Sequence, residues 1–390
     1  MKNEKLEMKK RNNNRCRMKD NRCNYILNIV ARWVVGLVFL FSSFVKGVDP
    51  MGTMFKVQEY MTAWSIGSMT FEWALPFAGV LSVALVCAEF IIGVLLIFNA
   101  YRRLAAWGLA AMMLFFTVTT LIDALTNKVT DCGCFGDAVK LTNWQTFWKN
   151  IALDVPTVWI VLTRNLRRKR RFERDAIVLL IALAAMLVFA MYNIKHEPVI
   201  DFRPWKIGNR MIEEREAMNH MVMQNIETGE TTTVDYRNGE WNSVPDEYKD
   251  FSKWEVLSST SDEPFEIKAP GFSMMDIEGN DHALELLPAE DGLIIVTVHH
   301  LEDVDKDGVR GMTMALSIAE ENNLPIVLLT SALPEDVQSW LYQNNISGMN
   351  YLFADATAIE TMLRGNPGYM FVKDAVVVDK TRKIRDLKIQ

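Results

Sequence analysis

Residues 73–98 read WALPFAGVLSVALVCAEFIIGVLLIF, and this stretch decides the class of fold. It carries one charged side chain, Glu89, in a run long enough to cross a bilayer. About 20 consecutive apolar residues span the hydrocarbon core as an α-helix, since each residue advances the helix by about 1.5 Å. The stretch therefore predicts a membrane-spanning helix.

Four more apolar windows lie on either side of this stretch. They cover residues 25–45, 104–122, 144–163 and 176–194. The window 144–163 is the least apolar, because Lys149, Asp154 and Pro156 interrupt it. We therefore expect a membrane α-helical bundle of four spanning helices, with a fifth helix as an additional anchor.

Basic residues alternate with the five windows and predict the orientation of the chain. They gather in residues 1–24, which carry nine Lys and Arg against three Asp and Glu, at Arg102 and Arg103, and in residues 164–174. Basic loops remain in the cytoplasm. We expect a bacterial inner-membrane protein with a cytoplasmic N-terminus. The segments expected in the periplasm are residues 47–72, residues 123–143 and everything after about residue 196.

The second half of the chain has a different composition. Residues 195–390 carry 18 Lys and Arg against 35 Asp and Glu, without a basic stripe. This acidic balance argues against a nucleic-acid partner, and the apolar windows exclude an ordinary soluble enzyme. Composition divides the chain into a basic tail, a four-helix bundle, a basic loop with the fifth helix, a connecting region with a hairpin, and a final domain: residues 1–24, 25–165, 166–194, 195–264 and 265–390.

Two of the five cysteines, Cys132 and Cys134, lie in the sequence DCGCFGD at the predicted outer end of the third window. Cysteines separated by one residue close a small ring, and strained or exposed disulfides are the more oxidising ones. Gly133 and Gly136 give the backbone the freedom that such a turn requires. The pair is our catalytic candidate for thiol–disulfide exchange; a simple loop tie, or metal binding with other ligands, remains open. The other cysteines are expected to be unpaired thiols without a special role: Cys16, Cys23 and Cys87.

Charged side chains inside the apolar windows are further candidates. Glu89 lies about ten residues, or about 15 Å, from the predicted cytoplasmic end of its helix, and Arg32 has a comparable depth in the first window. A charge in the membrane is costly unless it is paired, so such residues are functional candidates. We expect an Arg32–Glu89 contact inside the bundle, with Asp154 as a second intramembrane group. A structural pair and a proton-transferring group both remain open.

Six short segments between residues 25 and 165 occur in an ordered set. They are RWVVG at 32–36, FVKGVDP at 44–50, QEY at 58–60, LP at 75–76, AEFIIG at 88–93 and CGCFG at 132–136. This set resembles the DoxX/MauE group of integral membrane proteins. The resemblance implies a four-helix membrane bundle linked to thiol–disulfide chemistry outside the cytoplasm. In MauE, the methylamine-utilisation member, this chemistry concerns the maturation of a disulfide-rich dehydrogenase.

The same resemblance implies particular site residues and partners. The family pattern falls on Glu89, on the two cysteines of the loop and on four further residues, Lys46, Asp49, Pro50 and Tyr60. Its implied partner is an extracytoplasmic thiol or disulfide protein, besides membrane lipid. The sequence shows no evident cofactor. Electrons that cross the membrane would need a carrier such as a quinone, which the sequence does not support, or a second cysteine pair.

The final domain, residues 265–390, reads as alternating strands and helices. The predicted strands cover 293–298, 325–329, 351–353, 369–372 and 375–378, and the predicted helices cover 309–322, 334–344 and 356–363. This α/β order resembles thioredoxin-like domains related to periplasmic thiol–disulfide proteins. Within GNPGYMFV at 365–372, Pro367 is similar to the cis-proline that thioredoxins place opposite their active site.

The cysteines separate this domain from thioredoxins. Thioredoxins carry Cys-x-x-Cys after the first core strand, where a helix N-terminus lowers the thiol pKa. Here that place reads HHLEDV at 299–304, and no cysteine follows Cys134. The domain cannot perform dithiol chemistry alone, so we expect a binding module. A metal site at His299, His300, Glu302 and Asp303 is disfavoured, because adjacent strand residues point to opposite faces, and we assign no metal.

Two functions from different classes follow. In the first, the protein takes part in extracytoplasmic thiol–disulfide exchange, or in maturation of a partner protein, through the Cys132-Gly-Cys134 loop. In the second, it is a non-enzymatic membrane-anchored scaffold or assembly protein. A scaffold tolerates serine at both cysteine positions, whereas an exchanger does not. The order of a DoxX-like bundle and a thioredoxin-like domain without Cys-x-x-Cys is similar to that of DoxX-family proteins from Bacteroidetes.

Overall fold

The structure is a computed structural model of the 390-residue chain, and it divides into two compact units, Met1–Phe202 and Arg203–Gln390. The backbone is described for residues 2–66, 69–129, 133–163, 172–237, 240–262, 264–269 and 271–389, and the side chains of residues 2–23, 65, 66, 69, 70 and 72 are left out.

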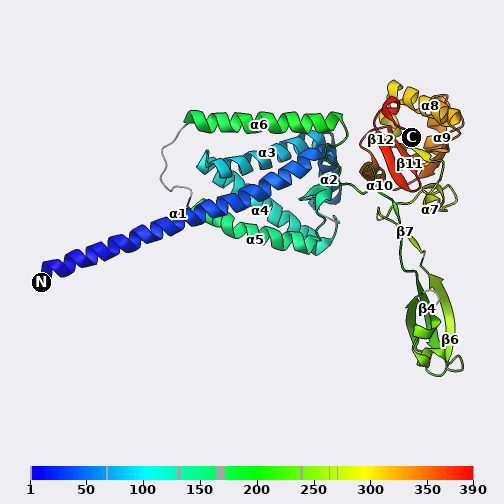
Figure 1. Ribbon diagram of the computed structural model, residues 1–390, viewed down its shortest axis with the longest axis horizontal. Coiled ribbons are helices and arrows are strands. Elements are labelled where there is room, and N and C mark those ends of the chain that lie inside the picture. Colours follow the sequence, from blue (N-terminus) through cyan, green and yellow to red (C-terminus); the bar gives the residue numbers. More distant parts are fainter. Residues whose placement is uncertain are drawn as a thin grey trace. The chain divides into compact units, whose positions relative to one another are not determined.

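The first unit consists of helices that lie side by side (Figure 1). The α-helices are α1 (Lys2–Val48), α2 (Pro50–Ala63), α3 (Ala78–Phe98), α4 (Arg102–Thr126), α5 (Asn143–Leu162) and α6 (Phe172–Lys195). α1 packs on α3, α4 packs on α5, and α6 lies along α3. Two short strands, β1 (Ser65–Ile66) and β2 (Met69–Thr70), and two 3₁₀ helices, Glu72–Phe77 and Gly136–Ala138, connect them.

Four helical segments of the described chain are long and apolar enough to cross a membrane. They are Asn24–Val48, Trp73–Phe98, Arg102–Thr126 and Phe172–Lys195. Large apolar side chains such as Leu114 and Val188 are exposed on them, as expected for helices whose outer faces contact lipid. The protein is therefore a membrane protein.

The predicted span 144–163 forms helix α5 but is not one of these four segments. Lys149, Asp154 and Pro156 make it less apolar than the others, although it is 20 residues long. Thr142 caps its N-terminus, where the Thr142 hydroxyl accepts a hydrogen bond from the Gln145 N–H. Whether α5 crosses the membrane stays a prediction. Most of the basic segment 164–174 lies outside the described residues.

Helices α1 and α3 approach closely at Gly36 and Gly93. A Cβ atom added at Gly36 would lie 3.2 Å from the Gly93 carbonyl oxygen, and one added at Gly93 would lie 3.1 Å from the Gly36 carbonyl oxygen. Small residues allow membrane helices to come this close. The crossing fixes which residues of α1 face which residues of α3.

The second unit contains a five-stranded sheet of order β10-β9-β8-β11-β12. β8, β9 and β10 are parallel, whereas β11 is antiparallel to both β8 and β12. The strands are β8 (Leu293–Val298), β9 (Ile326–Thr330), β10 (Asn350–Phe353), β11 (Gly368–Lys373) and β12 (Val376–Thr381). All six residues of β8 are buried, as expected for a central strand covered on both faces.

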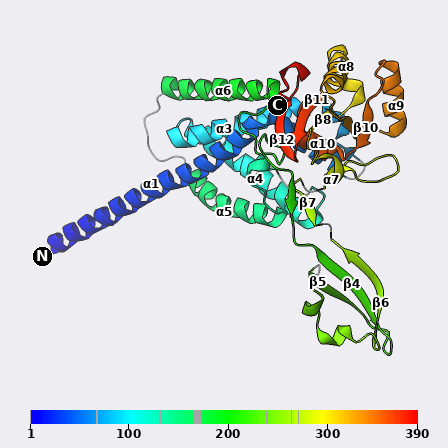
Figure 2. The same ribbon diagram turned by 45° about the vertical axis from the view of Figure 1, so that its right-hand side comes forward.

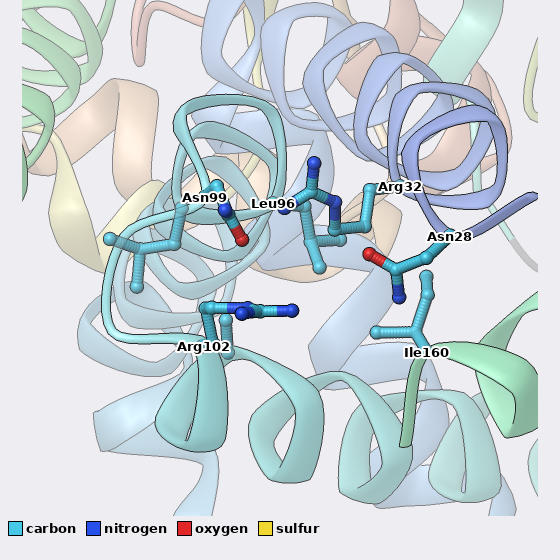
Figure 3. Close-up of a pocket in the computed structure, with 8 residues that line it drawn as sticks. Asn28, Arg32, Leu96, Asn99, Arg102 and Ile160 are labelled. Carbon is cyan, nitrogen blue, oxygen red and sulfur yellow. The ribbon is translucent and has the colours of Figure 1, made fainter. Parts of the chain in front are cut away.

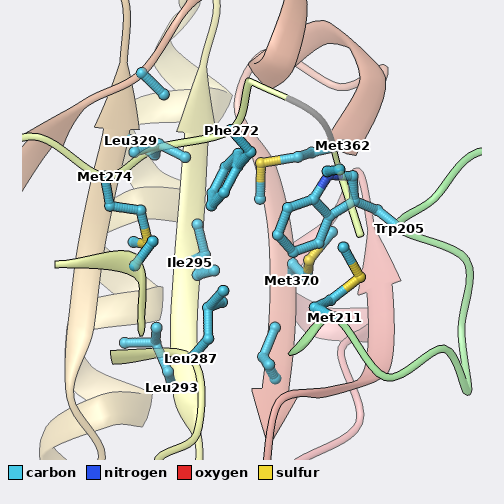
Figure 4. Packing of buried hydrophobic residues seen from close by; sticks show 14 of the residues in the cluster. Trp205, Met211, Phe272, Met274, Leu287, Leu293, Ile295, Leu329, Met362 and Met370 are labelled. Carbon is cyan, nitrogen blue, oxygen red and sulfur yellow. The ribbon is translucent and has the colours of Figure 1, made fainter. Parts of the chain in front are cut away.

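Helices cover both faces of this sheet (Figure 2). α8 (Lys306–Glu321) and α9 (Pro334–Gln343) pack on one face, and α7 (Ala283–Leu286) and α10 (Ala356–Met362) pack on the other. On the second face, Trp205, Phe272 and Met370 belong to one buried cluster (Figure 4). Each strand and helix expected between residues 293 and 378 is present, although α8 begins three residues earlier than expected and β12 ends three residues later.

Two smaller sheets precede this one in the chain. β3 (Ile212–Glu214) pairs with β7 (Phe265–Ile267), and a separate sheet has the order β5-β4-β6. The strands of the separate sheet are β4 (Met218–Asn225), β5 (Thr231–Arg237) and β6 (Trp254–Ser261). Between β4 and β5, the Asn225 side chain accepts hydrogen bonds from the N–H groups of Glu227 and Thr228. The remaining short elements are the 3₁₀ helices Trp241–Ser243, Asp246–Lys249, Leu301–Asp303 and Ile384–Asp386.

Candidate functional site

A buried ion pair joins α1 to α3. The Lys46 ammonium lies 2.6 Å from Oε1 of Glu89, and their side chains are 7% and 1% exposed. Lys46 also lies over the ring of Phe116 in α4, 5.3 Å from its centre. Two charges at this depth are retained only where each compensates the other, because an unpaired charge in the membrane is costly.

Ser42 connects this pair to the cysteine loop, the described residues 133–138. Its hydroxyl lies 2.9 Å from Oε2 of Glu89 and 2.7 Å from the carbonyl oxygen of Cys134. Ser42 stands one helical turn before Lys46, so both side chains point to the same face of α1. A hydroxyl has one hydrogen to donate. Ser42 therefore donates either to the buried carboxylate or to the backbone of the loop.

Aromatic and glycine residues pack the cysteine loop against the helices of the bundle. The Phe135 ring lies 5.4 Å from that of Phe41 in α1, and the Lys149 ammonium of α5 lies 4.4 Å from the centre of the Phe135 ring. Gly136 has a φ of +49°, and a Cβ atom added there would lie 3.2 Å from Val45. The loop needs glycine at this position for its conformation and for its close approach to α1.

The cysteines are described only in part. Cys134 is half-buried in the loop, and Cys132 lies outside the described residues. Cys87 is a free, buried thiol of α3. The side chains of Cys16 and Cys23 lie outside the described part of the chain.

A second polar group joins α2, α4 and α5 beside the loop. The Tyr60 hydroxyl donates to Oδ2 of Asp123, which is fully buried. The Asn143 side-chain amide donates to the carbonyl oxygens of Asp123 and Val129, at 3.3 and 2.9 Å. The sequence interpretation identified Tyr60 but missed Asp123 and Asn143. The sequence feature that could have identified Asp123 is its position, one residue after the third apolar window.

Asp49 and Pro50 determine where α2 begins. Oδ1 of Asp49 accepts a hydrogen bond from the Gly52 N–H at 3.0 Å, and Pro50 is the first residue of the helix. An acidic N-cap followed by proline is a favoured helix start. These two positions direct the helix that carries Tyr60 to Asp123.

The expected contact between Arg32 and Glu89 is wrong. Glu89 contacts Lys46 and Ser42, whereas Arg32 lines a pocket with Leu96 and Asn99 near the other end of α3 (Figure 3). The reason is the register of α1 and α3. Because Gly36 meets Gly93, a residue before Gly36 faces residues after Gly93, and Glu89 faces residues after Gly36.

Asp154 belongs to a different contact. Its Oδ2 accepts a hydrogen bond from the Thr117 hydroxyl at 2.9 Å, which joins α5 to α4. Glu89 and Asp154 therefore have different hydrogen-bond partners.

In the second unit, Asn366 ties the end of β8 to the loop before β11. Its Oδ1 accepts a hydrogen bond from the His299 N–H at 2.9 Å, and its Nδ2 donates to the His300 carbonyl oxygen at 2.8 Å. The Asn366–Pro367 peptide bond is cis. A Cβ atom added at Gly308 of α8 would lie 2.7 Å from Pro367, so the first turn of α8 also touches this loop.

Burial determines the protonation of His299. Desolvation, and then the positive charges of Arg364 and His300, lower the pKa of His299 to about 4. The ring is therefore neutral at pH 7. In the described ranges, no group of three His, Cys, Asp or Glu side chains is placed to hold a metal ion.

Residues 24–163 match the family model described as methylamine utilisation protein MauE. This part of the membrane protein is therefore similar to MauE. The match covers the described residues of the site from Ser42 to Asn143 and ends before α6, so the MauE part of the resemblance is confirmed. No curated protein and no solved structure matches the chain.

Proposed function

We propose that this MauE-like protein takes part in thiol–disulfide exchange outside the cytoplasm, with Cys132 and Cys134 as the exchanging pair. The observation that supports it best is the position of Cys134, whose carbonyl oxygen lies 2.7 Å from a serine that also contacts a buried carboxylate. The loop is thus held on a polar network inside the bundle. The alternation of basic segments supports a cytoplasmic N-terminus and a periplasmic loop and second unit.

The exchange balances without a bound cofactor. A thiolate of the pair attacks the disulfide of a partner protein and forms a mixed disulfide, while the other partner sulfur leaves and takes a proton. The second cysteine of the pair then attacks the mixed disulfide. The pair becomes a disulfide and the partner a dithiol, so two electrons pass to the partner; the reverse sequence oxidises the partner.

The second unit serves in this proposal as the binding module. Its alternation of strands and helices supports a thioredoxin-like domain, and no cysteine follows Cys134. The end of β8, where thioredoxins carry their cysteines, has His299 and His300 instead. We expect it to bind the partner protein.

The test measures the redox state of Cys132 and Cys134 in intact membranes. Free thiols are trapped with a mass-tagged alkylating agent before and after treatment with a mild reductant. Cys87→Ser is the matched control, because it removes the buried thiol of α3 and leaves the loop unchanged. An exchanger cycles between both states, and Cys132→Ser or Cys134→Ser accumulates a reducible mixed disulfide with a second protein. Thiols that remain free, or a pair that stays locked until denaturation, would rule the exchange out.

The second candidate is a membrane-anchored scaffold, which the missing cysteines of the second unit favour. In that case Cys132→Ser/Cys134→Ser leaves the maturation of partner proteins unchanged. The exchanger hypothesis expects that maturation to fail, so the same double variant separates the two functions.

A further inference from the structure

Lys56 of α2 lies against the backbone of the cysteine loop, next to Cys134. A Cβ atom added at Gly133 would lie 3.1 Å from Cγ of Lys56, 3.7 Å from its Cδ and 3.6 Å from its Cε. The ammonium nitrogen is one bond beyond Cε, so it lies within about 5 Å of the same position. Glycine permits this approach, because Gly133 has a φ of +59° and no side chain that would displace the lysine.

A second lysine lies on the other side of Cys134. The Lys149 ammonium of α5 is 4.4 Å from the ring centre of Phe135, the residue that follows Cys134. Each neighbour of Cys134 in the chain therefore has a lysine side chain against it. Positive charge near a thiol favours its deprotonated form, and this thiolate is the nucleophile in disulfide exchange.

Negative charges near the loop oppose the two lysines only in part. Glu59 pairs with Lys56 at 2.7 Å, but the Glu59 side chain is 36% exposed, so water and salt screen its charge. Asp137 is half-buried in the loop and adds one negative charge. The other titratable groups beside the loop have partners from the bundle: Lys46 with Glu89, and Tyr60 with Asp123.

We propose that Lys56 holds Cys134 in its thiolate form at neutral pH. This inference rests on the proposed exchange function. The lysine acts through its charge alone: the Cys134 thiol releases its proton to water, and the Lys56 ammonium keeps all of its own. The thiolate then attacks a sulfur of the partner disulfide, one S–S bond forms while the other breaks, and the leaving sulfur takes a proton.

The experiment measures how fast iodoacetamide alkylates Cys134 in the reduced full chain, from about pH 5 to about pH 10, a range that brackets the ordinary titration of a thiol. The chain carries Cys132→Ser, so the tryptic peptide 129–140 contains Cys134 and no other cysteine. The sulfur bonds to the reagent carbon as iodide leaves, so the rate follows the thiolate fraction. No exchange partner is needed for this measurement.

Lys56→Gln should raise the midpoint of the rate profile by about half a pH unit and leave the rate at high pH unchanged or slightly higher. A merely structural role of Lys56 would change the rate at high pH, through access to the thiol, without moving the midpoint. Lys56→Arg keeps the charge and should keep the midpoint. Glu59→Gln removes the opposing carboxylate and should lower it.

Lys195→Gln is the matched control, since Lys195 is an exposed lysine at the end of α6. An unchanged midpoint in Lys56→Gln, or an equal shift in Lys195→Gln, would overturn the proposal. Failure of the exchange function itself is seen separately, as a cysteine pair that never cycles between its redox states. A shifted midpoint in such a protein would support the effect of Lys56 and reject the exchange.

Discussion

The buried carboxylate of Glu89 is a single residue on which the stability of the bundle depends. In Glu89→Gln the Lys46 ammonium loses the charge of its partner. Breaking a buried pair costs about 3–5 kcal/mol, whereas replacing both partners costs much less. We expect Glu89→Gln to lower the thermal stability of the purified protein strongly, and Lys46→Met/Glu89→Leu to recover most of the loss.

The control for this variant is Glu59→Gln. Glu59 pairs with Lys56 at 2.7 Å, but both side chains are partly exposed. An exposed pair contributes about 0–1 kcal/mol, so this change should hardly alter stability. Equal destabilisation by Glu59→Gln and Glu89→Gln would refute the importance of burial.

His299 makes the free energy of unfolding of the second unit depend on pH. Its pKa is lowered to about 4 in the folded state, while an unfolded histidine titrates near pH 6.5. Between these values the unfolded state binds the extra proton, so the free energy of unfolding falls as pH falls from about 6.5 to 4, by about 3 kcal/mol in total.

Hydrogen exchange of β8 peptides in the full chain, corrected for the intrinsic effect of pH, measures this change. His299→Gln should abolish the loss of protection between pH 6.5 and pH 4. The exposed His196→Gln should retain it. A pH dependence that persists in His299→Gln would assign the effect to another group.

Of the residues in this polar network, Glu89 and Lys46 could be identified from the sequence, whereas Ser42 could not. Glu89 stood out because it is charged within an apolar run, and Lys46 entered through the resemblance to a family. Ser42 carried no signal, because a serine in an apolar helix is common. Its role depends on the loop that folds back onto α1, 92 residues later in the chain.

At the scale of elements, the crossing of α1 and α3 decides which residues meet. An alanine at Gly93 would place its Cβ atom 3.0 Å from Leu40 and 3.1 Å from the Gly36 carbonyl oxygen. Helix propensity favours alanine by about 1 kcal/mol, but overpacking costs about 1–3 kcal/mol. We expect Gly93→Ala to reduce thermal stability.

Gly108→Ala is the matched change in α4. Its nearest neighbour, a side-chain atom of Ile92, would lie 3.4 Å from the new Cβ atom, which is an ordinary contact. This variant should therefore be neutral or more stable. A stabilising Gly93→Ala would show that the two helices can separate without cost.

Most elements could be predicted because their signals are local. Apolar runs mark the spanning helices, and short buried runs separated by helical patterns mark the strands of the second unit. The pairing of α1 with α3 is not local. Counting depth from each helix end placed Arg32 beside Glu89, because the count ignored the glycine crossing that fixes the register.

At the scale of the whole molecule, two units have separate cores. The second unit buries one cluster around Trp205 and Met370 and another around Val296 and Tyr369, on opposite faces of its sheet. We therefore expect residues 203–390, expressed alone, to be soluble and to unfold cooperatively in urea. The measurement is circular dichroism with near-ultraviolet detection. A chain without near-ultraviolet signal would show that the membrane unit is required for folding.

Composition predicted this division better than it predicted the site. The change from apolar windows to an acidic chain near residue 195 lies close to the boundary at Phe202 and Arg203. The site, by contrast, gathers Ser42, Tyr60, Glu89 and Asp123 from different helices. Their assembly depends on packing that no single window contains.

The fully buried β8 strand has a consequence for the conformational entropy of the binding proposed for the second unit. β9 hydrogen-bonds to one edge of β8 and β11 hydrogen-bonds to the other, and every side chain of β8 is buried. Such a strand opens last in native-state fluctuations. If the proposed partner docks at its His299 end, it meets backbone that is ordered before contact, and association there loses little conformational entropy.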